Sequence, residues 1–124
     1  MKTLKHRLLL PLAGALLLTG MQAAHAEQPN RPECIAPSKP GGGFDLTCKL
    51  AQAGLKDNKI LKTPMRVTYM PGGIGAVAYN AIVANRRNDP GTLVAFSGAS
   101  LLNLALGKYG RFDENEVQWL TTIG

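Results

Sequence analysis

The residues that decide the fold are 34–57, which read CIAPSKPGGGFDLTCKLAQAGLKD. The first three are apolar and are followed by Pro37, which ends a strand. Residues 41–43 are three glycines, which are typical of a turn. From residue 44 to about 57, apolar side chains recur at helical spacing on one face, which carries Phe44, Cys48, Ala51 and Leu55. The segment predicts a short strand, a glycine-rich turn and a helix.

The same order of strand, turn and helix recurs twice more along the chain. The second unit has a strand at 65–69, a turn at 71–73 and a helix from 74 to about 87; the third has a strand at 92–96, a turn at 97–99 and a helix from 101 to 106. Strands that alternate with helices predict βαβ units, a parallel sheet and right-handed crossovers. The expected class is therefore α/β.

The two longer predicted helices should each present one face to the sheet. The first has a second, polar face with Asp45, Lys49, Gln52 and Lys56. Asp45 and Lys49 are four residues apart, which predicts an ion pair that contributes a few tenths of a kcal/mol. The second helix is expected to bury one stripe, made of Ile74, Val77, Ala78, Ala81 and Ile82.

The first 26 residues have the pattern of a secretory signal peptide. Lys2, Lys5 and Arg7 precede an apolar run at 8–18, and residues 24–26 read Ala-His-Ala, with small residues where a signal peptidase cleaves. The run is well short of the roughly 20 residues that cross a bilayer, which disfavours a membrane anchor. Without a cysteine at the cleavage site, a lipid anchor is also disfavoured. We expect cleavage after Ala26 and a mature chain, residues 27–124, in the periplasm.

Charge and histidine content exclude several classes of function. Three of the 14 Lys and Arg residues lie in the signal, which leaves 11 basic and 8 acidic residues, a net charge of +3, in the mature part. These charges form no dense patch with interleaved aromatic residues, so nucleic-acid binding is not expected. Both histidines, His6 and His25, lie in the signal. The mature chain therefore lacks a histidine for a catalytic triad, a general base or a zinc site, and we expect no enzyme, catalytic residue, metal or cofactor.

The three turns each lie where a predicted strand ends and a helix begins. In an open parallel sheet the ligand binds at this edge. The first N–H groups of a helix have no intrahelical partner and carry partial positive charge, so converging turns favour an anion. Each turn alone is weak evidence for a binding site. Residues 41–43 could be only a flexible turn, and residues 71–75 could be an ordinary bend between a strand and a helix. Residues 97–100 could be a helix cap, through Ser97 or Ser100. Their occurrence at the same position of three successive units favours an anion site.

Three stretches of this chain carry a resemblance to a known family. Residues 40–45 read Pro-Gly-Gly-Gly-Phe-Asp, residues 71–76 read Pro-Gly-Gly-Ile-Gly-Ala, and residues 88–93 read Asn-Asp-Pro-Gly-Thr-Leu. Together they resemble the receptors of tripartite tricarboxylate transporters, the Bug-type periplasmic solute-binding proteins. The resemblance extends from Cys34 to the end of the chain.

The resemblance implies a two-lobed fold that closes on a small carboxylate, such as a tricarboxylate or a dicarboxylate. It implies a monomeric receptor that delivers this ligand to the membrane subunits of the transporter. By matching motif it assigns to the ligand the first-loop residues Gly42, Gly43, Phe44 and Asp45, and the second-loop residues Gly72, Gly73, Ile74 and Gly75. Ser97, Gly98 and Ala99 match the position of the third loop.

The chain departs from the family pattern in two residues and in length. Lys49 stands where the family usually has Arg, and Gly91 stands where an aromatic residue commonly precedes Thr92. A second lobe is lacking, so residues 27–124 are expected to be a partial N-terminal lobe. A non-functional truncated product is one alternative. The other is a fragment of an α/β enzyme that binds a phosphate or nucleotide, although residues 41–43 match neither the dinucleotide motif nor the P-loop.

Cys34 and Cys48 are the two cysteines of the chain. They could be buried, reduced residues that behave as small hydrophobes. In the periplasm, two cysteines in one small domain favour a disulfide instead. The first lies on the predicted strand and the second faces the sheet from the predicted helix, so a bond is geometrically plausible. We expect this disulfide to hold the first loop from behind and to contribute about 3 kcal/mol.

The last eight residues, 117–124, are β-prone and are predicted to be the beginning of a strand, cut short by the end of the chain. Within them lies the single tryptophan, Trp119. We expect it to pack as an aromatic side chain beside this last strand. Stacking on a ligand is the alternative, but no glycine-rich turn adjoins it.

Overall fold

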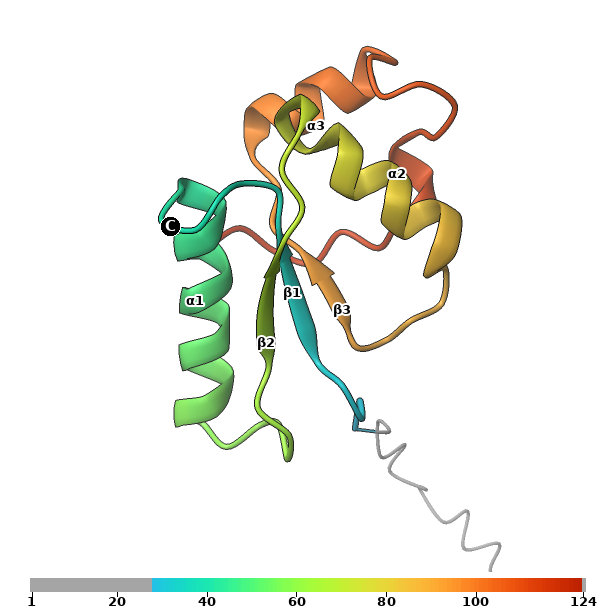
Figure 1. The fold of residues 1–124 in the computed structure, drawn as a ribbon. Coiled ribbons are helices and arrows are strands. Elements are labelled where there is room, and N and C mark those ends of the chain that lie inside the picture. The colour runs from blue at the N-terminus through green and yellow to red at the C-terminus, as the bar shows by residue number, and fades with distance from the viewer. Residues whose placement is uncertain (1–27, 124) are drawn as a thin grey trace, which may run out of the picture.

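Three short parallel strands form a sheet at the centre of the fold (Figure 1). The computed structural model describes residues 28–123, so the predicted signal peptide, residues 1–26, lies outside the described residues. The strands are β1 (Glu33–Ala36), β2 (Arg66–Tyr69) and β3 (Thr92–Val94). Their order is β2-β1-β3, and β1 pairs in parallel with both neighbours. The predicted α/β class and parallel sheet are confirmed.

Each strand is followed by a helix. The helices are α1 (Gly43–Asp57), α2 (Ala76–Asn85) and α3 (Gly98–Ala105), with single 3-10 turns η1 (Gly73–Gly75) and η2 (Glu114–Glu116). In Figure 1, α1 lies along one side of the sheet, α2 lies on the other, and α3 lies beyond the carboxyl ends of the strands. The predicted bounds of α1 are correct to one residue, β3 is two residues shorter than predicted, and α3 begins three residues earlier.

The alternation of side chains along β1 divides the core into two clusters. One cluster lies under α1 and contains Cys34, Ala36, Cys48, Met65 and Ala95. The other lies under α2 and contains Tyr79, Val83, Leu104 and Tyr109. Ile35 lies between Cys34 and Ala36 and is buried on the opposite face, which its 1% exposure shows. Burying a side chain of this size contributes about 2 kcal/mol.

The expected disulfide between Cys34 and Cys48 is present. The two sulfur atoms are 2.08 Å apart and the two Cα atoms 5.6 Å apart. The bond joins the central strand β1 to the second turn of α1, five residues beyond the glycine turn. It therefore fixes α1 against the sheet.

The predicted start of the second helix is wrong, and of its predicted buried stripe Ala78 is buried, whereas Ile74 and Val77 are exposed. The helix begins at Ala76, because Ile74 and the glycines beside it have positive φ angles. Val77 is 49% exposed, whereas Tyr79 and Val83 are buried. The helix is apolar nearly all round, so its sequence defines no single stripe. Its orientation is set by Tyr79, which packs on the rings of Phe96 and Tyr109.

The predicted strand at the end of the chain is also wrong, since residues 117–123 form none. The indole N–H of Trp119 donates to the carbonyl of Glu114 at 2.9 Å, and its ring lies 5.5 Å from that of Phe96. These contacts turn the segment back, and it runs across the strands rather than along β3 (Figure 1). Trp119 therefore makes the contacts of a structural aromatic residue, although the strand beside which it was expected to pack does not form.

Candidate functional site

Three connections meet at the carboxyl ends of the strands: loop 1 (37–42), loop 2 (70–75) and loop 3 (95–97). Because β1 lies between β2 and β3, the chain leaves β1 toward one side of the sheet and reaches β3 on the other. The crevice between β1 and β3 is thus the topological switch point, where ligands bind in open α/β sheets.

A cavity of about 330 Å³ lies at this switch point. Its lining is Gly43, Phe44 and Thr47 from the start of α1, and Phe96 and Ser97 from loop 3. The start of α1, directly after loop 1, and loop 3 therefore line one hollow, and no residue of loop 2 lines it. The rings of Phe44 and Phe96 provide apolar surface, and the polar groups of the lining are the hydroxyls of Thr47 and Ser97 and the backbone.

The start of α1 supplies the donors of this cavity. Gly42 is the N-cap, it has extended backbone, and it makes no side-chain cap. The first intrahelical bond runs from the Leu46 N–H to the Gly42 carbonyl at 3.1 Å. The N–H groups of Gly43, Phe44 and Asp45 precede that bond and have no partner within the helix. They are available to an anion at the positive end of a 15-residue helix.

The carboxylate of Asp45 is fully buried and is bound by groups of the protein itself, and Asp45 is not among the residues that line the cavity. It accepts hydrogen bonds from the Gly41 N–H at 2.6 Å, the Lys49 ammonium at 2.8 Å and the Tyr69 hydroxyl at 3.0 Å. The predicted pair with Lys49 is confirmed, although Asp45 does not lie on a solvated face. The Lys49 bond, then the Gly41 bond, lowers the pKa of Asp45. Only its backbone N–H is left for a ligand.

Loop 2 has an unusual backbone. Gly72, Gly73, Ile74 and Gly75 all have positive φ angles. For a β-branched residue such as Ile74, with φ 52°, this conformation is strained. Its carbonyl accepts hydrogen bonds from the Ser100 hydroxyl at 2.8 Å and from the Tyr109 hydroxyl at 2.5 Å. These two donors hold the strained turn in place.

Gly75 shows how tightly loop 2 is packed. It is buried, and a Cβ there would lie 3.2 Å from the Tyr109 hydroxyl oxygen and 3.3 Å from that of Ser100. By contrast, the Ile74 side chain is 58% exposed. Of the four loop 2 residues predicted to bind a ligand, the described contacts place none on the wall of the cavity.

Loop 3 is organised by a helix cap. The Ser97 hydroxyl accepts from the Ser100 N–H at 3.1 Å, which is the capping role that the sequence left open. The N–H groups of Gly98 and Ala99 lie in the first turn of α3 and have no intrahelical partner. Ser97 therefore both caps α3 and lines the cavity.

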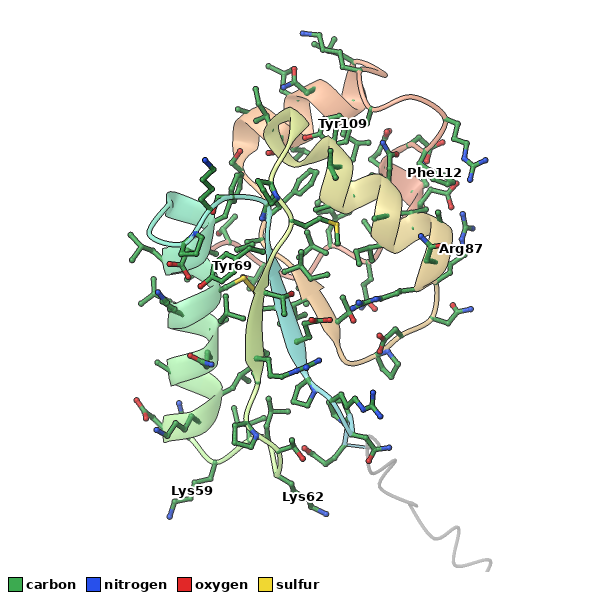
Figure 2. The ribbon with its side chains drawn as sticks, in the orientation of Figure 1. Lys59, Lys62, Tyr69, Arg87, Tyr109 and Phe112 are labelled. Carbon is green, nitrogen blue, oxygen red and sulfur yellow. A yellow bond between two sulfur atoms is a disulfide. The ribbon has the colours of Figure 1, made fainter. Side chains whose placement is uncertain are left out.

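Sequence reasoning missed the residues that connect the three loops. Tyr69 joins the end of β2 to loop 1, while Ser100 and Tyr109 join loop 2 to α3 and to the segment beyond it. Figure 2 labels Tyr69 beside the first turn of α1 and Tyr109 near the start of α2. Side chains alternate along β2, so Tyr69 lies on the same face as Val67. This alternation was the one feature of the sequence from which a contact of Tyr69 with α1 could have been predicted.

A second cavity, of about 400 Å³, lies at the other end of the strands, between residues 28–31 and 89–91. It is the larger of the two, but no loops that open into helices converge on it. The Asp89 carboxylate beside it already accepts from the Gly91 N–H at 2.9 Å and the Thr92 hydroxyl at 2.7 Å. We therefore assign the candidate site to the carboxyl edge.

Residues 28–123 contain no group of three or more His, Cys, Asp or Glu side chains that could hold a metal ion. No helix in this described part combines the length and the apolar character needed to cross a membrane. Comparison with protein-family models, with curated proteins and with solved structures gives no match. The ligand must therefore be inferred from the loops and motifs of this chain.

Proposed function

We propose that this chain binds a small carboxylate at the carboxyl edge of its sheet, as part of a periplasmic receptor for a tripartite tricarboxylate transporter. In this proposal the described domain is one lobe of a two-lobed solute-binding fold. The observation that carries it is the set of unpartnered N–H groups of Gly43 and Phe44 beside the cavity at the switch point. The three motifs that resemble the receptor family support the same ligand.

The chemistry of the cavity suits a carboxylate. Adjacent N–H groups at a helix start can each donate to one carboxylate oxygen, and the helix dipole adds about half a positive charge. Lys49 neutralises the buried charge of Asp45, so that this charge does not oppose an anion at the same helix end. Ser97 lines the other wall, although its hydroxyl already bonds to the N–H and the hydroxyl of Ser100.

Binding to this chain alone should be weak. The cavity is open to water, so a carboxylate exchanges hydrogen bonds with water for similar bonds with N–H groups, and each exchange contributes little. Association also costs several kcal/mol of translational and rotational freedom. We expect a dissociation constant of about 1 mM or weaker, with a second lobe needed to exclude water.

An NMR titration of the ¹⁵N-labelled chain with citrate, succinate and acetate tests the proposal. At matched ionic strength in sodium chloride, the amide resonances of Gly43 and Phe44 should move with the carboxylates and not with chloride. Equal shifts in chloride, or shifts spread over surface lysines, would contradict it.

Two glycines of α1 provide a matched pair of variants. A Cβ at Gly43 or at Gly54 meets no atom within 4 Å, so alanine fits at both. Only Gly43 lines the cavity. Gly43→Ala should weaken carboxylate binding because its methyl group occupies the hollow, whereas Gly54→Ala should leave binding unchanged. Equal effects of the two variants on carboxylate binding would show that the start of α1 is not part of the site.

A further inference from the structure

Tyr69 is the residue that connects loop 1 to the sheet. It ends the edge strand β2 and is 38% exposed, yet its hydroxyl donates to the fully buried carboxylate of Asp45 at 3.0 Å. The two residues are 24 positions apart in the sequence. The bond therefore links the edge strand to a buried charge in the first turn of α1.

The three donors to Asp45 differ in how firmly they are held. Lys49 has a side chain that is 53% exposed and can turn into water. The Gly41 N–H belongs to the loop itself. Tyr69 alone of the three is fixed by the sheet, through the pairing of β2 with β1. Its hydroxyl therefore sets where the Asp45 carboxylate lies.

The Asp45 carboxylate in turn sets where loop 1 lies. Gly41 has a φ of 86°, and its N–H is held by Asp45. The other described ties within the loop are local: the Gly42 N–H and the Ser38 hydroxyl donate to the Lys39 carbonyl, at 3.2 and 3.0 Å. The disulfide at Cys48 fixes the body of α1 and not the loop.

We propose that Tyr69 is a positioning residue for the carboxylate site: through Asp45 it holds loop 1 and the first turn of α1 so that the Gly43 and Phe44 N–H groups face the cavity. This inference rests on the proposed function, because the proposed function places the carboxylate at those N–H groups. Tyr69 itself does not line the cavity.

The test compares Tyr69→Phe with Tyr79→Phe in the purified chain. Both variants remove one tyrosine hydroxyl that donates within the protein, and that of Tyr79 bonds to the Asp113 carbonyl, away from loop 1. Only Tyr69→Phe should raise the pKa of Asp45, followed by ¹³C NMR of its carboxyl carbon, because the ionised form loses a donor. It should also speed hydrogen exchange of the Gly41 amide by about tenfold and weaken citrate binding at least about threefold.

Each result decides between the claims. An unchanged Asp45 titration and unchanged Gly41 exchange in Tyr69→Phe would overturn the positioning role. Altered loop readouts with unchanged citrate affinity would also overturn it, because loop 1 would then not control binding. If the unmodified chain binds no carboxylate, the proposed function fails, and with it the role of Tyr69 at a carboxylate site; the Asp45 and Gly41 readouts would still show whether Tyr69 holds loop 1.

Discussion

Loops 1 and 2 have similar sequences, each with a proline followed by glycines between a strand and a helix, but they are built differently. In loop 1 only Gly41 has a positive φ angle, and α1 starts with ordinary backbone at Gly43. In loop 2, four successive residues from Gly72 have positive φ. Loop 1 is held by a buried charge, whereas loop 2 is held by two neutral hydroxyls on the Ile74 carbonyl.

The difference separates two tasks that the motifs alone do not distinguish. Loop 1 presents unpartnered N–H groups of a long helix without strain, so it is suited to bind an anion. Loop 2 stores strain that Ser100 and Tyr109 compensate, and it links β2 to α3. We therefore expect the start of α1, which follows loop 1, to contact the ligand directly, and loop 2 to have a supporting role.

The largest expected effect concerns the disulfide behind loop 1. Replacing both cysteines, Cys34→Ala with Cys48→Ala, should lower the free energy of unfolding by about 3 kcal/mol, because the closed loop no longer restricts the unfolded chain. Guanidinium unfolding followed by circular dichroism measures this. A loss below about 1 kcal/mol would show that packing of α1 on β1 holds this region without the bond.

Next in size is a matched substitution in the two loops. Gly75→Ala should cost about 2 kcal/mol, because its φ of 99° is unfavourable for alanine and its Cβ would press on Tyr109 and Ser100. Gly43→Ala should be neutral or stabilise by up to about 1 kcal/mol, because it lies in a helix and its Cβ meets open space. The same unfolding curves measure both variants. Similar losses of unfolding free energy in the two would contradict the proposed difference between the loops.

A smaller effect of opposite sign is expected at Ile74. Asparagine tolerates the left-handed conformation better than isoleucine, and the Ile74 side chain is already 58% exposed. Ile74→Asn should therefore stabilise the chain by roughly 0.5 to 1 kcal/mol. Thermal unfolding provides the measurement. A destabilised variant would mean that the isoleucine side chain contributes packing that outweighs the strain.

The smallest expected effect is a difference in acid response. The pKa of Asp45 is lowered in the folded chain, first by Lys49 and then by the Gly41 N–H. Its stabilising contribution is present above the unfolded pKa of about 3.9 and is lost as pH falls through the lower folded value. The Gly41 amide resonance should shift in this range, whereas that of Gly75 should not, because loop 2 is held by hydroxyl groups and not by a carboxylate. Parallel shifts of both amides would contradict this.

Much of the scaffold could be predicted from the sequence because it depends on local patterns. The strand at Cys34, the helix from Gly43, the disulfide and the pair between Asp45 and Lys49 follow from periodicity and spacing. The left-handed Ile74 could not be predicted, since its donors Ser100 and Tyr109 lie 26 and 35 residues away. Ile74, which the apolar spacing places in the helix, is held out of it by tertiary contacts.

The candidate site was predictable only in part for the same reason. Its loops follow from the glycine motifs, and their convergence follows from the parallel sheet. That loop 3, with Phe96, shares a cavity with the start of α1 depends on the strand order β2-β1-β3, which the sequence pattern does not reveal. The contact of Tyr69 with Asp45 depends on the same tertiary arrangement.

The most direct test of the account is a crystal structure of the chain soaked in bromoacetate, whose bromine atom can be located by anomalous scattering. The account predicts a bromine peak between Phe44 and Phe96, with the carboxylate oxygens within hydrogen-bonding distance of the Gly43 and Phe44 N–H groups. An ordered bromoacetate bound instead on loop 2, or at the cavity beside Asp89, with the hollow between Phe44 and Phe96 empty, would contradict it.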